Sequence, residues 1–311
     1  MAITIAPITD SFAAEIGDID LSRPLSAEDA EAVRQAFWKY SVLVFPEQKL
    51  EAEHLPFAFG VVEEAEQHLE FAKLFGPLEI SMGVYGDGPM RTRAEIADVS
   101  NLNHRNEIWG KESRLRMFQL GNRLWHTDSS FKRLPALCSL LYARSIPPVG
   151  GHTEFADQRA AYDALPEDAK RRLHGLVAEH CIAYSRARLG FDNWTEAERK
   201  NLPPVPQMLV RTIPQNGRRS LYLASHAGRI VGMPDEEGKR LIDELIAHTT
   251  QRQFVYTHRW RAGDLVMWDN RCTMHRGREF DDLRYKRDMQ RATVSDVANS
   301  CEQEGVAVAA E

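Results

Sequence analysis

The sequence lacks the features that define several protein classes. No run approaches the roughly 20 apolar residues that span a bilayer, and the start, MAITIAPITDSF, lacks the basic and long apolar regions of a secretion signal. We therefore expect a cytoplasmic protein without a membrane partner. No internal repeat, low-complexity tract or Ser/Gly linker divides the chain, so residues 1–311 are expected to form a single domain.

Cysteine is scarce, and neither sign of charge dominates. The four cysteines, Cys138, Cys181, Cys272 and Cys301, are far apart and form no CxxC pair, which favours structural thiols over a zinc ribbon or a disulfide framework. Lys and Arg number 39 against 45 Asp and Glu, so the net charge is 39 − 45 = −6. The basic residues are scattered, and we expect no nucleic-acid partner.

The hydrophobic pattern predicts a mainly β protein with flanking helices. Short β-rich runs separated by turns fill most of the chain after residue 130, and Asn216-Gly217 is a strong hairpin signal between two of them. This pattern indicates a sandwich or jelly roll with helices packed outside it. Predicted strands cover 41–45, 138–143, 208–212, 220–224, 254–260, 265–268 and 292–294, and predicted helices cover 26–39, 63–75, 166–176 and 235–250.

One short motif suggests a metal site. In WHTDS (125–129), His126 and Asp128 are two residues apart, so an extended strand would project both side chains from one face. A bare HxD motif is weak evidence, because a His and an Asp often share a wet surface. His275, which follows an apolar strand, would add a second imidazole. Two His and one carboxylate leave metal positions open, which suits non-haem Fe(II) chemistry and not a closed structural zinc site.

Two arginines follow this histidine. Arg287 and Arg291 are four residues apart, so a strand would place both guanidinium groups on one face, where each could pair with a carboxylate. Taken alone, the pair is better explained as two surface arginines on an edge strand.

Together these residues resemble the taurine/2,4-dichlorophenoxyacetate dioxygenase family, and the phenoxyacetate-cleaving members most of all. The resemblance covers most of the chain and implies a double-stranded β-helix, a cupin-like jelly roll. It also implies Fe(II), 2-oxoglutarate as co-substrate, and O2. The blocks that carry it are SVLVF (41–45), FAKLFGPL (71–78), LWHTDSSF (124–131), GGHTEFAD (150–157), AAYDAL (160–165), FVY (254–256), GDLVMWDNR (263–271) and HRG (275–277).

The resemblance implies a role for each candidate site residue. His126, Asp128 and His275 match the iron ligands of the family. Arg287 and Thr153 match the residues that hold the distal carboxylate of 2-oxoglutarate. Arg291 matches the position that meets the anionic group of the prime substrate, and Asn122 falls where some members place a polar contact.

The expected substrate is a small anionic, aromatic compound. Hydroxylation of an aryloxyalkanoate such as a phenoxyacetate at its ether carbon would give a phenol, an oxo acid, succinate and CO2, which implies a role in aromatic compound degradation. A lid-like loop at about 80–120 offers pocket-wall candidates, although its aromatic residues could equally seal the contact of a homo-oligomer, which we expect. These candidates are Tyr85, Met90, Trp109, Met117 and Phe118.

Three other functions remain open. A sulfonate or alkyl sulfate would also satisfy the fork of Arg291. A zinc hydrolase could use the same two His and one Asp, but it would leave Arg287 and Thr153 without a role. A non-catalytic jelly roll could use the metal only to stabilise its fold. Succinate formation from 2-oxoglutarate with Fe(II) and O2 would separate these readings.

Overall fold

A seven-stranded sheet forms the base of the molecule. The computed structural model describes residues 3–50, 53–57, 60–64, 66–80, 91–200 and 202–306. Strands β3, β15, β7 and β17 lie at the centre of the sheet in antiparallel pairs, and the sheet order is β1-β2-β3-β15-β7-β17-β6. The strands are β1 (Thr4–Pro7), β2 (Ala13–Gly17), β3 (Val42–Phe45), β6 (Ile96–Asp98), β7 (Ala136–Ser145), β15 (Leu265–Asp269) and β17 (Asp288–Ser295).

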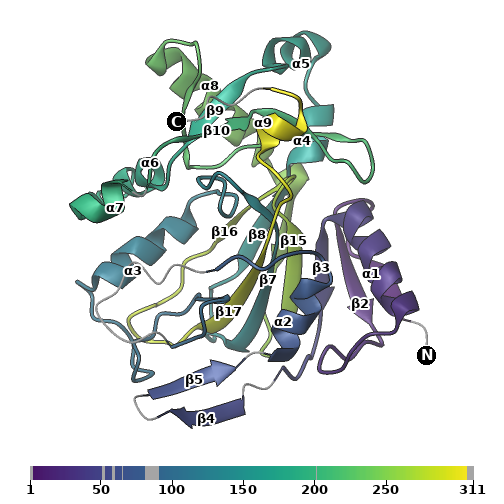
Figure 1. Ribbon diagram of the computed structural model, residues 1–311, viewed down its shortest axis with the longest axis vertical. Coiled ribbons are helices and arrows are strands. Elements are labelled where there is room, and N and C mark those ends of the chain that lie inside the picture. Colours follow the sequence, from purple (N-terminus) through teal and green to yellow (C-terminus); the bar gives the residue numbers. More distant parts are fainter. Residues whose placement is uncertain are drawn as a thin grey trace.

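A smaller sheet faces the inner side of the seven-stranded sheet (Figure 1). It consists of β8 (Thr153–Asp157) between β14 (Val255–His258) and β16 (Thr273–Gly277), all antiparallel. Side chains alternate across a strand, so Leu141 and Val266 of the large sheet meet Phe155 of the small one in a shared core. This core and the two sheets make the jelly roll that the sequence predicts.

Two helices cover the outer side of the large sheet. Helix α1 (Ala27–Tyr40) begins at Ser26, whose hydroxyl accepts a hydrogen bond from the Asp29 N–H at 3.0 Å, as a capping residue does. Helix α2 (Glu66–Lys73) packs beside it. Because these helices present Phe37 and Leu69 to the alternate residues of β3, β7 and β15, the large sheet is buried on both faces.

A helical region covers the outer side of the small sheet at the top of Figure 1. It holds the sheet β10-β9-β13 and the hairpin β11-β12. The strands are β9 (Val177–His180), β10 (Val205–Met208), β11 (Val210–Thr212), β12 (Arg219–Leu221) and β13 (Ala227–Ile230). The helices are α4 (Gln158–Asp163), α5 (Glu167–Leu173), α6 (Ile182–Ala187), α7 (Glu196–Lys200), α8 (Asp235–Thr249) and α9 (Ser300–Gln303).

The remaining elements are the hairpin of β4 (Glu53–Phe57) and β5 (Gly60–Glu64), helix α3 (Arg114–Gln119) and the adjoining 3-10 turn η1 (Leu120–Arg123). The 3-10 turn η2 (Arg252–Phe254) packs against the helical region. Among the described residues, no helix is long and apolar enough to cross a membrane. All four cysteines are buried free thiols.

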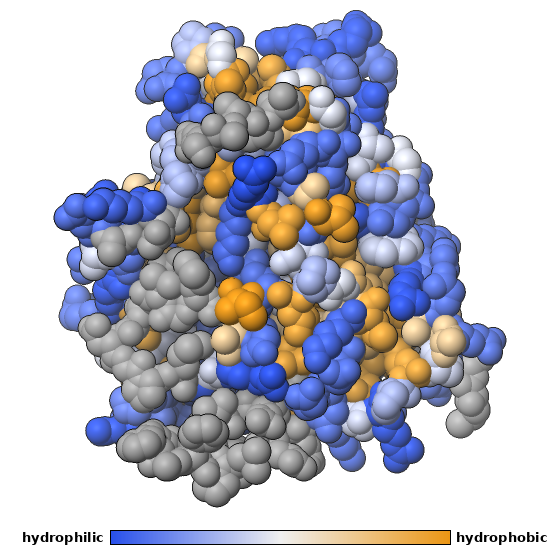
Figure 2. All heavy atoms as spheres, in the orientation of Figure 1, coloured by the Kyte–Doolittle hydropathy of each residue, from blue (hydrophilic) through white to orange (hydrophobic). Residues whose placement is uncertain are grey.

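Most of the predicted elements are confirmed. The hairpin turn at Asn216-Gly217 joins β11 to β12, and Gly217 adopts a φ of 67°, which glycine tolerates best. Helices α5 and α7 are almost wholly hydrophilic on the surface, as Figure 2 shows at its upper right and left.

Three predicted boundaries were wrong. The helix predicted over 63–75 begins only at Glu66, because residues 60–64 pair with β4. The strand predicted over 208–212 is two strands, since β10 pairs with β9 whereas β11 pairs with β12. The lid-like loop predicted at about 80–120 contains β6 and α3, and residues 81–90 lie outside the described part of the chain.

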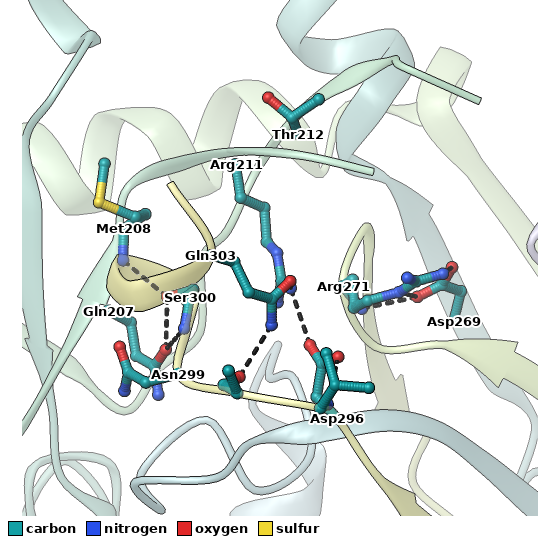
Figure 3. A network of polar contacts seen from close by, with 12 residues as sticks. Gln207, Met208, Arg211, Thr212, Asp269, Arg271, Asp296, Asn299, Ser300 and Gln303 are labelled. Carbon is teal, nitrogen blue, oxygen red and sulfur yellow. Dashed lines mark hydrogen bonds and ion pairs between the residues drawn. The ribbon is translucent and has the colours of Figure 1, made fainter. Parts of the chain in front are cut away.

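A buried ion pair ties the C-terminal segment to the helical region (Figure 3). Arg211 of β11 donates hydrogen bonds to Asp296 at 2.8 Å and to Gln303 of α9 at 3.0 Å. Its guanidinium also lies over the ring of Tyr222. Burial alone would raise the pKa of Asp296, but Arg211 lowers it below the ordinary value.

We expect Asp296→Ala to lower the free energy of unfolding by about 3 to 5 kcal/mol, because it leaves a buried guanidinium without its counter-charge. Since the pKa of Asp296 is lowered in the folded state, the contribution of this carboxylate is present above the unfolded value of about 3.9. It is lost as the pH falls through the folded value.

Urea titrations at pH 7 and at pH 3 would measure both effects. The matched control is Asp163→Ala, which breaks the exposed pair with Arg218 and should cost less than about 1 kcal/mol. Equal losses for the two variants would contradict the prediction.

Candidate active site

Two histidines meet where the segment after η1 crosses the small sheet. The backbone N–H of His126 donates to the carbonyl of His275 at 3.0 Å, and the N–H of His275 donates to the carbonyl of His126 at 2.8 Å. This single bridge brings the two imidazoles side by side, with ring centroids 4.2 Å apart. The sequence prediction of an extended strand through Asp128 was wrong, because Asp128 already begins a turn. The carboxylate nevertheless lies beside both rings.

These three side chains form a group of possible metal ligands. One ligand atom from each lies within 4.8 Å of the others. The Nε2 atoms of His126 and His275 are 3.8 and 3.6 Å from the two carboxylate oxygens of Asp128. The Nδ1 atom of His126 donates to the Leu124 carbonyl at 2.8 Å, so its Nε2 lone pair is left for a metal.

The protonation states of the group suit a divalent metal. Burial lowers the pKa of His126, and it lowers the pKa of His275 well below the ordinary value, so both rings are neutral at pH 7. Burial alone would raise the pKa of Asp128, but Arg291, the two histidines and Ser139 lower it to about 2. Two neutral imidazoles and one carboxylate are the donors that non-haem Fe(II) prefers.

The cluster opens into a cavity at the end of the jelly roll. The cavity is lined by residues from β7, β8, β16, β17, α3 and η1, which the sandwich brings together from distant parts of the sequence. Of the predicted site residues, it is lined by His126, His275, Thr153, Arg287, Arg291 and Asn122.

Arg287 is a half-buried cation in the wall of this cavity. Its guanidinium lines the cavity, has no ion-pair partner among the described residues, and burial lowers its pKa to about 10. It therefore stays charged at pH 7. Its backbone N–H donates to the Asn101 side chain at 2.8 Å, and the amide of Asn101 donates to the carbonyls of Asp282 and Tyr285. This amide fixes the segment that enters β17.

The other predicted polar residues have protein partners. The Nη1 atom of Arg291 donates to the Oδ1 atom of Asp128 at 2.5 Å. The hydroxyl oxygen of Thr153 accepts a hydrogen bond from the indole of Trp260 at 2.9 Å. The amide of Asn122 donates to Gln119 at 2.6 Å. Arg291 thus contacts the group of possible metal ligands directly through Asp128, and the sequence did not indicate this contact.

The aromatic candidates divide into three groups. Trp109 lines the cavity, as predicted. Met117 and Phe118 were predicted at the pocket wall, but they pack against Phe191 and other apolar residues behind α3, because α3 is a helix and turns them away from the cavity. Tyr85 and Met90 lie outside the described residues.

Sequence reasoning missed the charged rim of the cavity. Arg116 of α3 makes two hydrogen bonds to Asp282 at 2.9 and 3.2 Å, and Arg123 lies 3.6 Å from the same carboxylate. Both arginines and Asp282 line the cavity. No local pattern could reveal this contact, because 166 residues separate Arg116 from Asp282.

A jelly roll with two histidines and one carboxylate at its open end defines the class of non-haem iron oxygenases. The family described as "Taurine catabolism dioxygenase TauD, TfdA family" matches residues 4–293. The chain belongs to this family. It is a 2-oxoglutarate-dependent dioxygenase whose cofactor and oxidant are Fe(II) and O2.

Named relatives cover almost the whole chain. It is 42% identical to the alpha-ketoglutarate-dependent 2,4-dichlorophenoxyacetate dioxygenase of Cupriavidus pinatubonensis, over 96% of this chain and 99% of that protein. It is 35% identical to an (S)-phenoxypropionate/alpha-ketoglutarate-dioxygenase of Sphingobium herbicidovorans, over 90% and 91% of the two chains. The crystal structure of AAD-2 in complex with Mn(II) and N-oxalylglycine matches with a TM-score of 0.84 and 44% identity, covering 96% and 99% of the chains.

We expect His126→Ala, Asp128→Ala and His275→Ala each to abolish Fe(II)-dependent turnover, because each removes one of three ligand atoms. Succinate formation at saturating iron measures turnover, and circular dichroism checks the fold. His174→Ala, which removes an exposed histidine after α5, is the control and should retain wild-type turnover. Full activity in any of the three ligand variants would remove that residue from the site.

Proposed function

We propose that the protein hydroxylates an aryloxyalkanoate, such as a phenoxyacetate, at its ether carbon. Hydroxylation there gives a hemiacetal that collapses to a phenol and an oxo acid, while 2-oxoglutarate becomes succinate and CO2. The observation that carries the proposal is the desolvated charge of Arg287, which has no ion-pair partner among the described residues, in the same cavity as His126 and His275. A site that combines a group of metal ligands with a desolvated cation is suited to an anionic co-substrate that binds beside the metal.

We assign the metal and co-substrate contacts to five residues. His126, Asp128 and His275 hold Fe(II), which supplies the O2-dependent oxidation of a substrate C–H bond. Arg287 binds the distal carboxylate of 2-oxoglutarate through its planar fork. Thr153 accepts a hydrogen bond from Trp260, so its own hydroxyl hydrogen is left to donate to that carboxylate.

The substrate is assigned to the part of the cavity that Arg291 lines. Arg291 holds Asp128 with Nη1 and also lines the cavity, so its other N–H groups can donate to the acid group of a substrate. Asn122 offers a polar contact on the neighbouring wall. Trp109 and Leu120 give that wall an apolar surface suited to a ring. These residues contribute by placing the substrate and by excluding water from the site.

The alternatives explain less of the cavity. A zinc hydrolase or a metal that only stabilises the fold would leave the desolvated charge of Arg287 without an anionic partner, at a cost that neither function offsets. A sulfonate or alkyl sulfate dioxygenase uses the same iron and co-substrate residues and remains the second candidate, because a sulfonate also fits the fork of Arg291.

The compartment and the assembly stay predictions. The four free thiols favour the reducing cytoplasm, where disulfides are rare. The predicted homo-oligomer would be tested by sedimentation at several protein concentrations.

We expect Arg287→Ala to raise the KM for 2-oxoglutarate sharply. Loss of a charge-assisted, partly desolvated contact costs about 2 to 5 kcal/mol. The control is Arg278→Ala, because Arg278 also lines the cavity but is half exposed and lies 3.6 Å from Glu154. This control should change the KM little. An unchanged KM for 2-oxoglutarate in Arg287→Ala, with weaker binding of the prime substrate alone, would contradict the assignment.

A substrate panel should show phenol release coupled one-to-one with succinate for phenoxyacetates or phenoxypropionates. The panel also contains arylacetates, taurine and alkyl sulfates, and both products are measured by chromatography. Arg291→Gln should weaken every anionic substrate, since a bound acid would lose its charged partner. Activity on sulfonates or sulfate esters alone would contradict the aryloxyalkanoate proposal but not the assignment of the iron ligands.

A further inference from the structure

A closed ring of hydrogen bonds begins and ends on Asp128. The backbone N–H of Asp128 donates to the Oδ1 atom of Asn270 at 3.1 Å. The Nδ2 atom of Asn270 donates to the hydroxyl of Ser139 at 2.9 Å, and that hydroxyl donates to the Oδ2 atom of Asp128 at 2.7 Å. The amide of Asn270 therefore holds the backbone of Asp128 directly and its carboxylate through Ser139.

The chemistry of the groups fixes the direction of every bond in the ring. An ionised carboxylate can only accept, so the single hydrogen of Ser139 must point to Asp128. The hydroxyl oxygen then accepts from the amide of Asn270. The Oδ1 atom of Asn270 receives two donors, the Asp128 N–H and the indole of Trp268 at 3.0 Å, so the amide cannot flip without losing both.

The ring is built into the rigid centre of the large sheet. Ser139 of β7 lies directly opposite Trp268 of β15 in the strand register. Ser139, Asn270 and Trp268 are at most 1% exposed. The indole of Trp268 also packs on the ring of His275, with centroids 4.6 Å apart. Because buried polar groups must be fully paired, removal of one member leaves the others unsatisfied.

We propose that Ser139 and Asn270 are positioning residues for metal binding, which act by fixing the plane of the Asp128 carboxylate. This inference rests on the proposed role of Asp128 as an iron ligand. The Oδ2 atom is held by Ser139 and the Oδ1 atom by Arg291, so the carboxylate keeps its orientation toward both imidazoles before a metal binds. Outer hydrogen bonds of this kind commonly change metal affinity by about 10- to 100-fold.

The test is the affinity for Mn(II) alone, without 2-oxoglutarate or substrate. Electron paramagnetic resonance of free Mn(II) in a titration gives the dissociation constant without any turnover. We expect Ser139→Ala to bind Mn(II) about 10- to 100-fold more weakly than the wild type. Ser139→Thr, which keeps the hydroxyl, should restore most of the affinity. Asn270→Asp keeps an acceptor for Trp268 but loses the donor to Ser139, and it should also bind weakly.

The matched control is Cys138→Ala, which removes one buried atom from the neighbouring residue of β7 on the opposite face of the sheet. It should lower the melting temperature and leave the Mn(II) affinity unchanged. Wild-type affinity in both Ser139→Ala and Asn270→Asp, or an equal loss in Cys138→Ala, would overturn the inference alone. Wild-type affinity in Asp128→Ala would overturn the iron-ligand assignment itself and the inference with it.

Discussion

The site depends on the reciprocal backbone pair between His126 and His275. These two hydrogen bonds, of 3.0 and 2.8 Å, attach the segment after η1 to the edge of the small sheet. The rest of the cluster depends on that attachment, because the two histidines are 149 positions apart in the sequence and have no local reason to meet. The backbone pair also sets the turn in which Asp128 stands, so the carboxylate reaches both rings although it belongs to no strand.

Charge is distributed unequally over the site. Arg291 pairs with Asp128 and helps to lower the pKa of that carboxyl to about 2. Arg287, by contrast, carries a half-buried charge with no ion-pair partner among the described residues. A protein that desolvates a guanidinium without pairing it loses stability, and the natural compensation is an anionic ligand. The structural pair of Arg211 and Asp296 shows the contrast, because there the protein itself supplies the anion.

The fold could be predicted as a class but not as a set of boundaries. Helix α1 has a capping serine and a strong apolar stripe, and the hairpin at Gly217 has a turn that few residues tolerate, so both follow from local chemistry. The start of α2 does not follow from local chemistry, since the pairing of β5 with β4 decides where that helix can begin. Similarly, Phe118 was misplaced because a loop and a helix of the same composition point their side chains in different directions.

For the site, the sequence by itself determined which residue types could carry the chemistry. The motif blocks give His126, Asp128 and His275, because each block is short and keeps its residues at fixed local spacing, and the resemblance to the family gives Arg287, which lies beyond the last block. Only the tertiary structure decided their partners. That Ser139 holds the carboxylate of Asp128 depends on strands that become neighbours only in the folded sheet. Local spacing is a property of the covalent chain, whereas a contact between distant strands exists only after the core has packed and fixed their register.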